Sequence, residues 1–346
     1  MAYTISRVYP SDRRALAQVD ALLEQEGIQR DGNLDYVAAM YDEDYRVIAT
    51  GSCFGNTLRC FAVSREHQGE GLLNQIITHL IEFQQERGNF RLFLYTKINS
   101  AKFFGDLGFY EIARVDGTLV FMENRRDGFE TYLKRLAKTR TEGKSAALVM
   151  NANPFTLGHQ YLCETASAGC DTLHLFVVSE DASLVPFAVR KQLIRAGTAH
   201  LPNVILHDSG PYIISSATFP SYFLKDEDKV IEGHARLDLA VFKKIAAALN
   251  VSIRYVGEEP TSQVTGLYNQ IMAEELPKAG IECRIIPRKA IGDQVISAST
   301  VRKALQDGDM ETFRRLVPET TAAWFESPEA APVLEQIRRA KDVVHY

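Results

Sequence analysis

The second half of the chain alternates short apolar runs with longer amphipathic stretches, and this alternation restricts the fold more than any other feature. The runs have the length of buried strands, and the stretches between them have helical periodicity. Such alternation predicts an α/β domain with a doubly wound parallel sheet and helices on both faces. The expected strands are 146–150, 173–178, 203–207, 253–257 and 283–287, and the expected helices are 158–168, 187–199, 236–249, 265–279 and 299–307.

The first half of the chain predicts a separate unit in which helices and strands are mixed. Helical periodicity at 13–25, 71–85 and 102–107 accompanies five strand-like runs, at 45–51, 58–63, 90–95, 110–113 and 118–121. Because 346 residues exceed one typical domain, we expect two. The charged segment 134–144 is the expected linker between domains 1–136 and 145–346, and the second domain is expected to end in helices after Pro318.

Composition excludes several classes of protein. The net charge of -5 and the pI near 6.0 argue against a broad nucleic-acid surface. No apolar run approaches the roughly 20 residues of a membrane span, and the N-terminus lacks the pattern of a signal peptide. Five cysteines without a CxxC pair favour reduced thiols. We therefore expect a cytoplasmic protein whose partners include neither nucleic acid nor a membrane.

The turn after the first strand of the second domain has the residues of a phosphate site. Backbone N–H groups at a helix N-terminus attract anions. Gly158 would allow close approach of a phosphate, and His159 adds a donor that can become cationic. A second segment, 296–302, has hydroxyl side chains at a helix start and an arginine one turn later. Together the two segments predict a nucleoside triphosphate site that includes Asn151, Asn153, Pro154, Phe155, Gly158, Gly257, Ile296, Ser297 and Ser299.

These two segments resemble the signatures of the HIGH nucleotidyltransferase superfamily, whose domain is Rossmann-like. The residues Thr156-Leu157-Gly158-His159 resemble its (H/T)xGH motif, with Thr in the first place, and Ile296-Ser297-Ala298-Ser299-Thr300-Val301-Arg302 resembles its second signature. The resemblance implies catalysis by Thr156, His159 and Arg302. In it, Thr156 and His159 contact the α-phosphate of ATP, while Ser297, Ser299 and Arg302 hold the leaving phosphates. Mg²⁺ usually bridges the phosphate oxygens.

A further resemblance concerns the first domain. Gln68-Gly69-Glu70-Gly71 resembles the acyl-CoA loop of GNAT acetyltransferases, and 103–109 resembles their later helix and turn. This implies a GNAT-like mixed sheet in which Gln68, Gly69 and Gly71 could hold a CoA-like pantetheine arm. Two departures matter: Leu73 replaces a small residue, and Phe104 replaces the usual acid tyrosine. A phenyl ring cannot donate a proton, so we do not expect acetyl transfer.

The combination of the two domains resembles the [citrate (pro-3S)-lyase] ligase family over nearly the whole chain. The phrases that carry the resemblance are 151–159, 200–204, 212–220 and 255–260. It implies an AMP-forming ligase that activates acetate with ATP. The acetyl group then passes to the thiol of a dephospho-CoA-derived prosthetic group on the acyl carrier subunit of citrate lyase.

Several alternatives remain open from the residues. One is another HIGH-superfamily adenylyltransferase or an acetate-activating ligase that modifies RNA, although the pI disfavours RNA. Another is a non-catalytic nucleotide or acyl-CoA sensor. Gly257 could line the adenosine or acyl pocket or lie in an ordinary turn, and the hydroxyl-rich 215–222 could receive the second substrate or merely connect elements. Arg190 and Lys191 are read as a solvated helix start, and His174, His200 and His207 as structural or surface residues.

Overall fold

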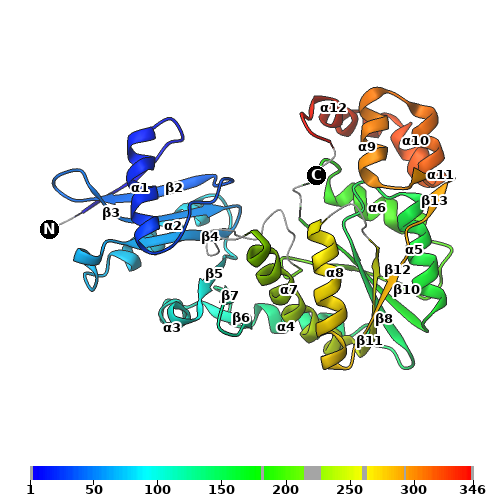
Figure 1. The fold of residues 1–346 in the computed structure, drawn as a ribbon, viewed down its shortest axis with the longest axis horizontal. Coiled ribbons are helices and arrows are strands. Elements are labelled where there is room, and N and C mark those ends of the chain that lie inside the picture. Colours follow the sequence, from blue (N-terminus) through cyan, green and yellow to red (C-terminus); the bar gives the residue numbers. More distant parts are fainter. Residues whose placement is uncertain (1–2, 181–182, 214–226, 259–262, 292–293, 344–346) are drawn as a thin grey trace. The chain divides into compact units, whose positions relative to one another are not determined.

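The computed structural model describes residues 3–180, 183–213, 227–258, 263–291 and 294–343. It has the mixed α/β fold expected from the sequence (Figure 1). The chain divides into two compact units, Met1–Thr131 with Thr218–Ala240, and Tyr132–Ala217 with Val241–Tyr346. The division falls inside helices α4 (Gly128–Ala137) and α7 (Glu227–Leu249).

The N-terminal unit contains a seven-stranded mixed sheet in the order β1-β2-β3-β4-β5-β7-β6. Neighbouring strands are antiparallel except β4 and β5, which run parallel and pair only at Thr57↔Phe93 and Leu58↔Leu94. The mixed sheet predicted for this half is therefore confirmed. Its strands are β1 (Thr4–Arg7), β2 (Tyr36–Tyr41), β3 (Val47–Phe54), β4 (Thr57–Val63), β5 (Phe93–Lys97), β6 (Tyr110–Val115) and β7 (Leu119–Glu123), and its helices include α1 (Arg13–Gln25), α2 (Leu72–Glu86) and α3 (Ile98–Asp106).

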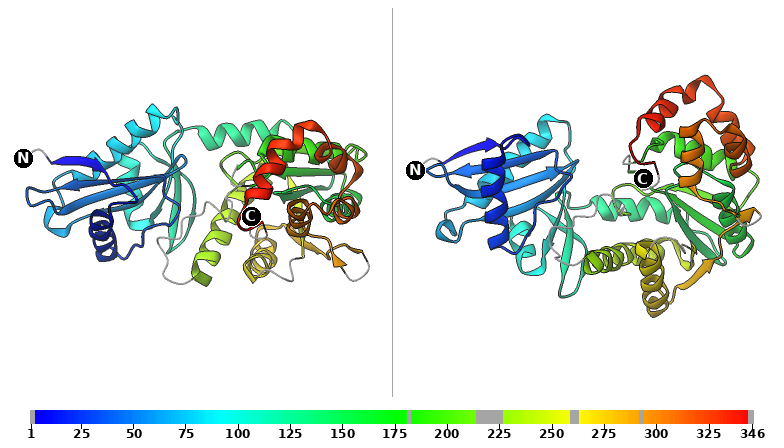
Figure 2. Two further views of the ribbon diagram at one scale, coloured as in Figure 1. Left: turned by 90° about the horizontal axis from the view of Figure 1, so that it is seen from above. Right: turned by 45° about the horizontal axis from the view of Figure 1, so that its top comes forward.

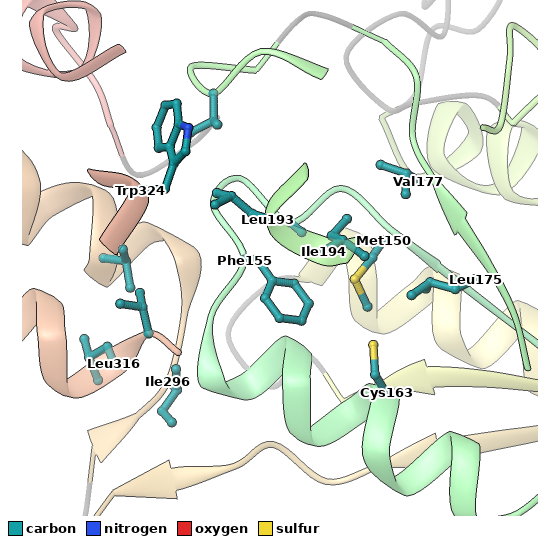
Figure 3. Close-up of a cluster of buried hydrophobic side chains, with 14 of the residues drawn as sticks. Met150, Phe155, Cys163, Leu175, Val177, Leu193, Ile194, Ile296, Leu316 and Trp324 are labelled. Atoms are coloured by element: carbon teal, nitrogen blue, oxygen red, sulfur yellow. The ribbon is translucent and has the colours of Figure 1, made fainter. Parts of the chain in front are cut away.

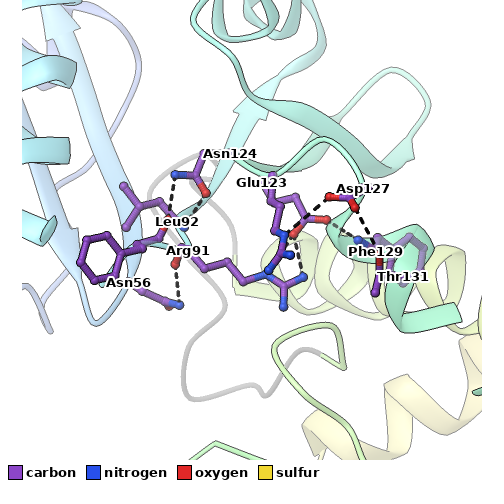
Figure 4. Close-up of polar contacts among 10 residues, drawn as sticks. Asn56, Arg91, Leu92, Glu123, Asn124, Asp127, Phe129 and Thr131 are labelled. Atoms are coloured by element: carbon purple, nitrogen blue, oxygen red, sulfur yellow. Dashed lines mark hydrogen bonds and ion pairs between the residues drawn. The ribbon is translucent and has the colours of Figure 1, made fainter. Parts of the chain in front are cut away.

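A buried carboxylate organises the end of β7 and the beginning of α4 (Figure 4). Glu123 accepts 2.6 Å from the backbone N–H of Phe129 and 2.9 Å from Nη2 of Arg91. Gly128 leaves the space that this carboxylate needs, because a Cβ there would lie 2.3 Å from Oε2 of Glu123. A negative charge at a helix N-terminus is stabilising, so Glu123 fixes where α4 starts.

The C-terminal unit contains the doubly wound parallel sheet that the sequence predicts. The strand order is β10-β9-β8-β11-β12, and every neighbouring pair is parallel. Helices α5 and α6 cover one face, and α8 with the end of α7 covers the other (Figures 1 and 2). The strands are β8 (Ser145–Met150), β9 (Thr172–Val177), β10 (Val204–Asp208), β11 (Val251–Gly257) and β12 (Glu282–Ile286), and the helices named here are α5 (Leu157–Ala168), α6 (Phe187–Gly197) and α8 (Gln263–Glu275).

The chain order reverses at β8, which lies between β9 and β11. Ligands of doubly wound sheets bind outside the carboxyl ends of the strands at such a point. The turn after Met150 and the end of β11 at Gly257 therefore meet at the edge where a ligand is expected.

A helical tail completes the C-terminal unit and includes a helix, Met310–Leu316, that the sequence analysis did not expect. Its helices are α9 (Ala298–Asp307), α10 (Met310–Leu316), α11 (Glu319–Phe325) and α12 (Ala331–Arg339), and a small hairpin of β13 (Ala290–Ile291) and β14 (Gln294–Val295) precedes them. Apolar side chains of this tail join the core on the α6 side of the sheet. Figure 3 shows Leu316 and Trp324 in the same cluster as Leu193 and Ile194.

The structure differs in detail from the sequence expectations at the segment 134–144 and at Arg190. The segment expected to be a linker begins inside α4, and Thr141 Oγ1 anchors its remainder by donating 2.8 Å to Thr172 Oγ1. Tyr212 and Ile213, which precede the hydroxyl-rich segment, lie in a turn and a bend. Arg190 is fully buried, whereas a solvated helix start was expected. Within the described part of the chain, no helix is long and apolar enough to cross a membrane.

Candidate functional site

Arg190 fixes the loop that follows β8. Its Nη1 donates to the backbone oxygen of Asn151 at 3.0 Å, to Oδ1 of Asn151 at 2.8 Å and to the oxygen of Val178 at 2.8 Å. The next residue, Ala152, has a φ of 51°, which side-chain-bearing residues adopt at a cost of about 1–2 kcal/mol. The buried guanidinium thus offsets backbone strain by tying the ends of β8 and β9 together.

Asn153 joins this loop to two distant segments. Its Oδ1 accepts 3.0 Å from the N–H of Val185, and its backbone oxygen accepts 2.6 Å from Nη1 of Arg302. Its side-chain Nδ2 is buried and has no hydrogen-bond partner in the described structure. Since buried donors usually have acceptors, this amide is available to a ligand atom. Pro154, which follows through a cis peptide bond, is also buried.

Thr156 and His159 form a capping box at the start of α5. Thr156 Oγ1 accepts 3.3 Å from the N–H of His159, and His159 Nδ1 accepts 3.1 Å from the N–H of Thr156. Because Nδ1 is an acceptor, the neutral imidazole must carry its proton on Nε2. The box therefore orients the ring and presents Nε2–H as a donor. The N–H groups of Leu157 and Gly158 have no acceptors within the helix.

The electrostatic surroundings of His159 are positive. Burial, followed by the charges of Arg288 and Arg302, lowers the pKa of His159 to about 4. The ring is therefore neutral at pH 7 in the ligand-free protein, whereas the sequence suggested a donor that could become cationic. Positive charge around a neutral donor favours an anionic ligand, and the same ligand would oppose the lowering of this pKa.

The second motif lies directly against the first. Ser297 is the N-cap of α9, where its Oγ accepts 3.1 Å from the N–H of Thr300 and lies 2.8 Å from Oγ of Ser299. A Cβ on Gly158 would lie 3.3 Å from the backbone oxygen of Ile296. The absence of a side chain at Gly158 thus lets the starts of α5 and α9 approach, so two segments far apart in sequence form one surface.

Arg302 is buried and does not reach into solvent. Only 2% of it is exposed, and its Nε donates 2.5 Å to the backbone oxygen of Val343 while Nη1 donates to Asn153. Burial lowers its pKa to about 10, against a smaller opposing effect of Asp342. Arg302 thus joins the first motif to the C-terminal tail and contributes charge from behind the loop.

The structure shows how the side chain of Phe155 and the backbone of Gly257 are placed, which the sequence did not reveal. The Phe155 side chain is in the core, where Figure 3 shows it with Met150 and Cys163, so only its backbone could face a nucleotide. Gly257 ends β11, and its oxygen accepts 3.0 Å from Nδ2 of Asn269. The segments 215–222 and 259–260 lie outside the described residues.

Sequence reasoning missed two cations that follow β12. Arg288 donates from Nε to the oxygen of Glu258 at 2.9 Å, and Nζ of Lys289 lies 5.6 Å from the centre of the Tyr161 ring. Both sit at the carboxyl edge of the sheet, close to α5. A basic pair directly after an expected parallel strand was the available signal, since such edges carry ligands.

The loop of the N-terminal unit that resembles an acyl-CoA site is exposed to solvent. Gln68, Gly69 and Gly71 are exposed, and Gly69 and Gly71 have φ values of 90° and 75°. Glu70 lies between the glycines and accepts 2.9 Å from the hydroxyl of Tyr3. Its charge disfavours a pyrophosphate at the start of α2, although solvent screens an exposed carboxylate. Phe104 is buried in the core of this unit.

Comparison with known proteins assigns the chain to a family. Residues 145–325 match the model of the citrate lyase ligase C-terminal domain. The [citrate [pro-3S]-lyase] ligase of Escherichia coli (strain K12) is 38% identical over 329 residues, which are 93% of this chain and 93% of that protein. The chain belongs to the citrate lyase ligase family. Like its relatives it is an enzyme of the ligase class.

Two further citrate lyase ligases are similarly close. The ligase of Haemophilus influenzae is 36% identical, and the match covers 91% of this chain and 96% of that protein. The ligase of Klebsiella pneumoniae is 38% identical, and the match covers 91% of this chain and 93% of that protein. Two solved structures illustrate a likeness that covers about a third of the chain. A putative acyl-CoA N-acyltransferase from Klebsiella pneumoniae covers 35% of this chain and 95% of its own at 20% identity and a TM-score of 0.30. The match with Escherichia coli ElaA covers 36% of this chain and 100% of that protein, at 15% identity and a TM-score of 0.30.

The residues at the citrate lyase ligase site fit a nucleotide better than a protein-held metal. The close approach at Gly158, the orphaned Nδ2 of Asn153 and the positive surroundings of His159 suit phosphate oxygens. Among the described residues, no group of three or more His, Cys, Asp and Glu side chains could hold a metal ion.

Proposed function

We propose that this chain is an AMP-forming ligase that activates acetate with ATP and acetylates citrate lyase. The observation that supports the proposal most is the relation to named citrate lyase ligases over more than nine tenths of the chain. The convergence of α5 and α9 beside β8 and β11 supports the nucleotide part independently. The relatives favour neither an RNA-modifying ligase nor a sensor.

In the first step, an acetate oxygen attacks the α-phosphorus of ATP, and the bond to the bridging oxygen breaks. Acetyl-adenylate forms and diphosphate leaves. His159 Nε2–H would donate to the α-phosphate as negative charge grows there, and the N–H groups at the start of α5 would support it. Ser297 and Ser299 would contact the leaving phosphates from the start of α9.

In the second step, the thiol of the prosthetic group on the acyl carrier subunit attacks the acetyl carbonyl. A thioester forms, the thiol proton is lost to solvent, and AMP leaves. Mg²⁺ would arrive bound to the phosphates of ATP, where it neutralises charge. All five cysteines of the chain are free, which suits a reducing compartment, and we place the reaction in the cytoplasm.

Acetate-dependent exchange of labelled diphosphate into ATP tests the first step. The reaction is reversible, so the full-length protein should exchange label only when acetate, ATP and Mg²⁺ are present together. Exchange without acetate would favour another adenylyltransferase activity, and no exchange under any of these conditions would contradict the proposal.

A further inference from the structure

The arginine of the second motif is poorly placed to meet a ligand. Arg302 is 2% exposed, and two of its nitrogens donate to the backbone oxygens of Val343 and Asn153 at 2.5 and 2.6 Å. Movement of this guanidinium toward a phosphate would break its bonds to the loop after β8 and to the C-terminal tail. Because the same bonds hold the first motif in place, such a movement would disturb the site it serves.

Arg288, by contrast, belongs to the ligand edge of the sheet. It follows β12 by two residues, and β12 pairs with β11 through Gly257↔Ile286. Its Nε donates 2.9 Å to the oxygen of Glu258, whose N–H donates 2.8 Å to the oxygen of Ile286. These bonds hold the base of the guanidinium over the carboxyl ends of two strands, and the side chain is only half-buried.

The segment that carries Arg288 also contacts both motifs. The backbone oxygen of Lys289 accepts 3.1 Å from the N–H of Ile296, the residue that lies against Gly158. Nζ of Lys289 lies over Tyr161, two residues after His159 on α5. After burial, the charge of Arg288 has the largest effect on the pKa of His159, ahead of Arg302. Arg288 is therefore near enough to the proposed α-phosphate donor for its charge to act there, in agreement with the contacts that Lys289 makes with both motifs.

We propose that Arg288 is the arginine that binds the triphosphate of the nucleotide, while Arg302 positions the first motif from behind. Arg288 would meet phosphate oxygens with the planar fork of N–H donors that suits them. The inference rests on the proposed function only for the identity of the nucleotide as ATP. The placement of Arg288 stands on the geometry of β11, β12 and α5.

The test measures ATP binding by calorimetry on the full-length protein and its Arg288→Gln variant. Lys303→Gln is the matched control, because it removes one positive charge beside Arg302 from an exposed side chain that pairs with Asp307. We expect Arg288→Gln to weaken ATP binding at least tenfold, with adenosine binding unchanged and Lys303→Gln unaffected. An ATP affinity within twofold of the wild type in Arg288→Gln would overturn the proposal, as would an equal loss for adenosine.

A second measurement separates charge at the site from a general loss of structure. NMR titration of His159 should show its pKa raised in Arg288→Gln, because a nearby positive charge has been removed, and restored in Arg288→Lys. An unchanged His159 pKa would contradict the placement of Arg288. The proposed function fails separately: a wild-type protein without acetate-dependent exchange would refute it, while weaker ATP binding by Arg288→Gln would still support this inference.

Discussion

The two motifs meet at Gly158, and a substitution at this residue tests their contact most sharply. Gly158→Ala places a Cβ 3.3 Å from the oxygen of Ile296, so α5 and α9 must separate by a few tenths of an ångström. We expect the KM for ATP to rise about tenfold, equivalent to ~1.4 kcal/mol, with little change in thermal stability.

Gly266→Ala is the matched control for this variant, because a Cβ at Gly266 in α8 meets nothing within 4 Å. That change should leave the KM for ATP unaltered and stabilise the helix by up to about 1 kcal/mol. Equal KM values for the two variants would show that the approach of α5 to α9 does not matter for nucleotide binding.

His159 carries the second prediction at this scale. His159→Ala removes the Nε2–H donor and one half of the capping box, so we expect kcat for AMP formation to fall roughly 10²–10³-fold. The lost cap should cost about 1 kcal/mol of stability and leave the fold intact. His200→Ala, which removes an exposed imidazole beside Glu164, should retain wild-type activity. Full activity of His159→Ala in a steady-state assay would refute the assignment.

Among the elements, the strands β9 and β10 bring two buried histidines into contact. His174 and His207 are buried side by side, with Nδ1 of the first 2.9 Å from Nε2 of the second, and burial lowers the pKa of each to about 4. In the unfolded chain both would titrate near about 6.5. Between these pH values the unfolded state binds more protons, so the free energy of unfolding falls as the pH falls.

We therefore expect thermal stability to decrease from pH 7 to pH 4.5. We expect His207→Asn to make that decrease shallower, because the variant lacks one of the two imidazoles that take up a proton on unfolding. Unfolding followed by circular dichroism across this pH range measures both slopes. An identical slope in His207→Asn would show that the buried pair does not titrate on unfolding.

The elements show which parts of the fold local patterns can reveal. The strands of the parallel sheet are continuous apolar runs between helices, so each was predicted to within two residues. The strand β2 (Tyr36–Tyr41), which lies next to the edge strand β1, was missed because its run of apolar residues around Ala38 and Ala39 shows no alternation. The first part of α7 was missed since its charged residues hide the helical period, which is visible only from Ala235 onward.

The candidate site divides in the same way. The turn after β8 and the start of α9 are local patterns, so Thr156, His159 and Ser297 could be proposed from the sequence alone. The contacts of Arg190 and Arg288 could not be predicted, because both residues donate to backbone oxygens that tertiary structure brings to them. The burial of Arg302 likewise depends on Val343, 41 residues away. Sequence patterns thus locate the ligand edge but do not show which cations face it.

At the scale of the whole molecule, the chain combines a ligase unit with a unit of another fold. The N-terminal unit has Phe104 buried where an acid would be needed and Glu70 at the start of α2. We expect the full-length protein to transfer no acetyl group from acetyl-CoA to amines, measured by release of free CoA thiol. Robust turnover above the uncatalysed rate would overturn this expectation.

The central claim concerns the reaction of the whole enzyme, in which ATP cleavage is coupled to acetylation of a carrier thiol. Mass spectrometry of the citrate lyase acyl carrier subunit, after incubation with this protein, acetate, ATP and Mg²⁺, tests it most directly. The predicted result is one acetyl group on the prosthetic-group thiol for each AMP formed, and none when His159→Ala replaces the wild type. A wild-type protein that leaves the carrier unacetylated, or that forms ADP in place of AMP, would contradict the account.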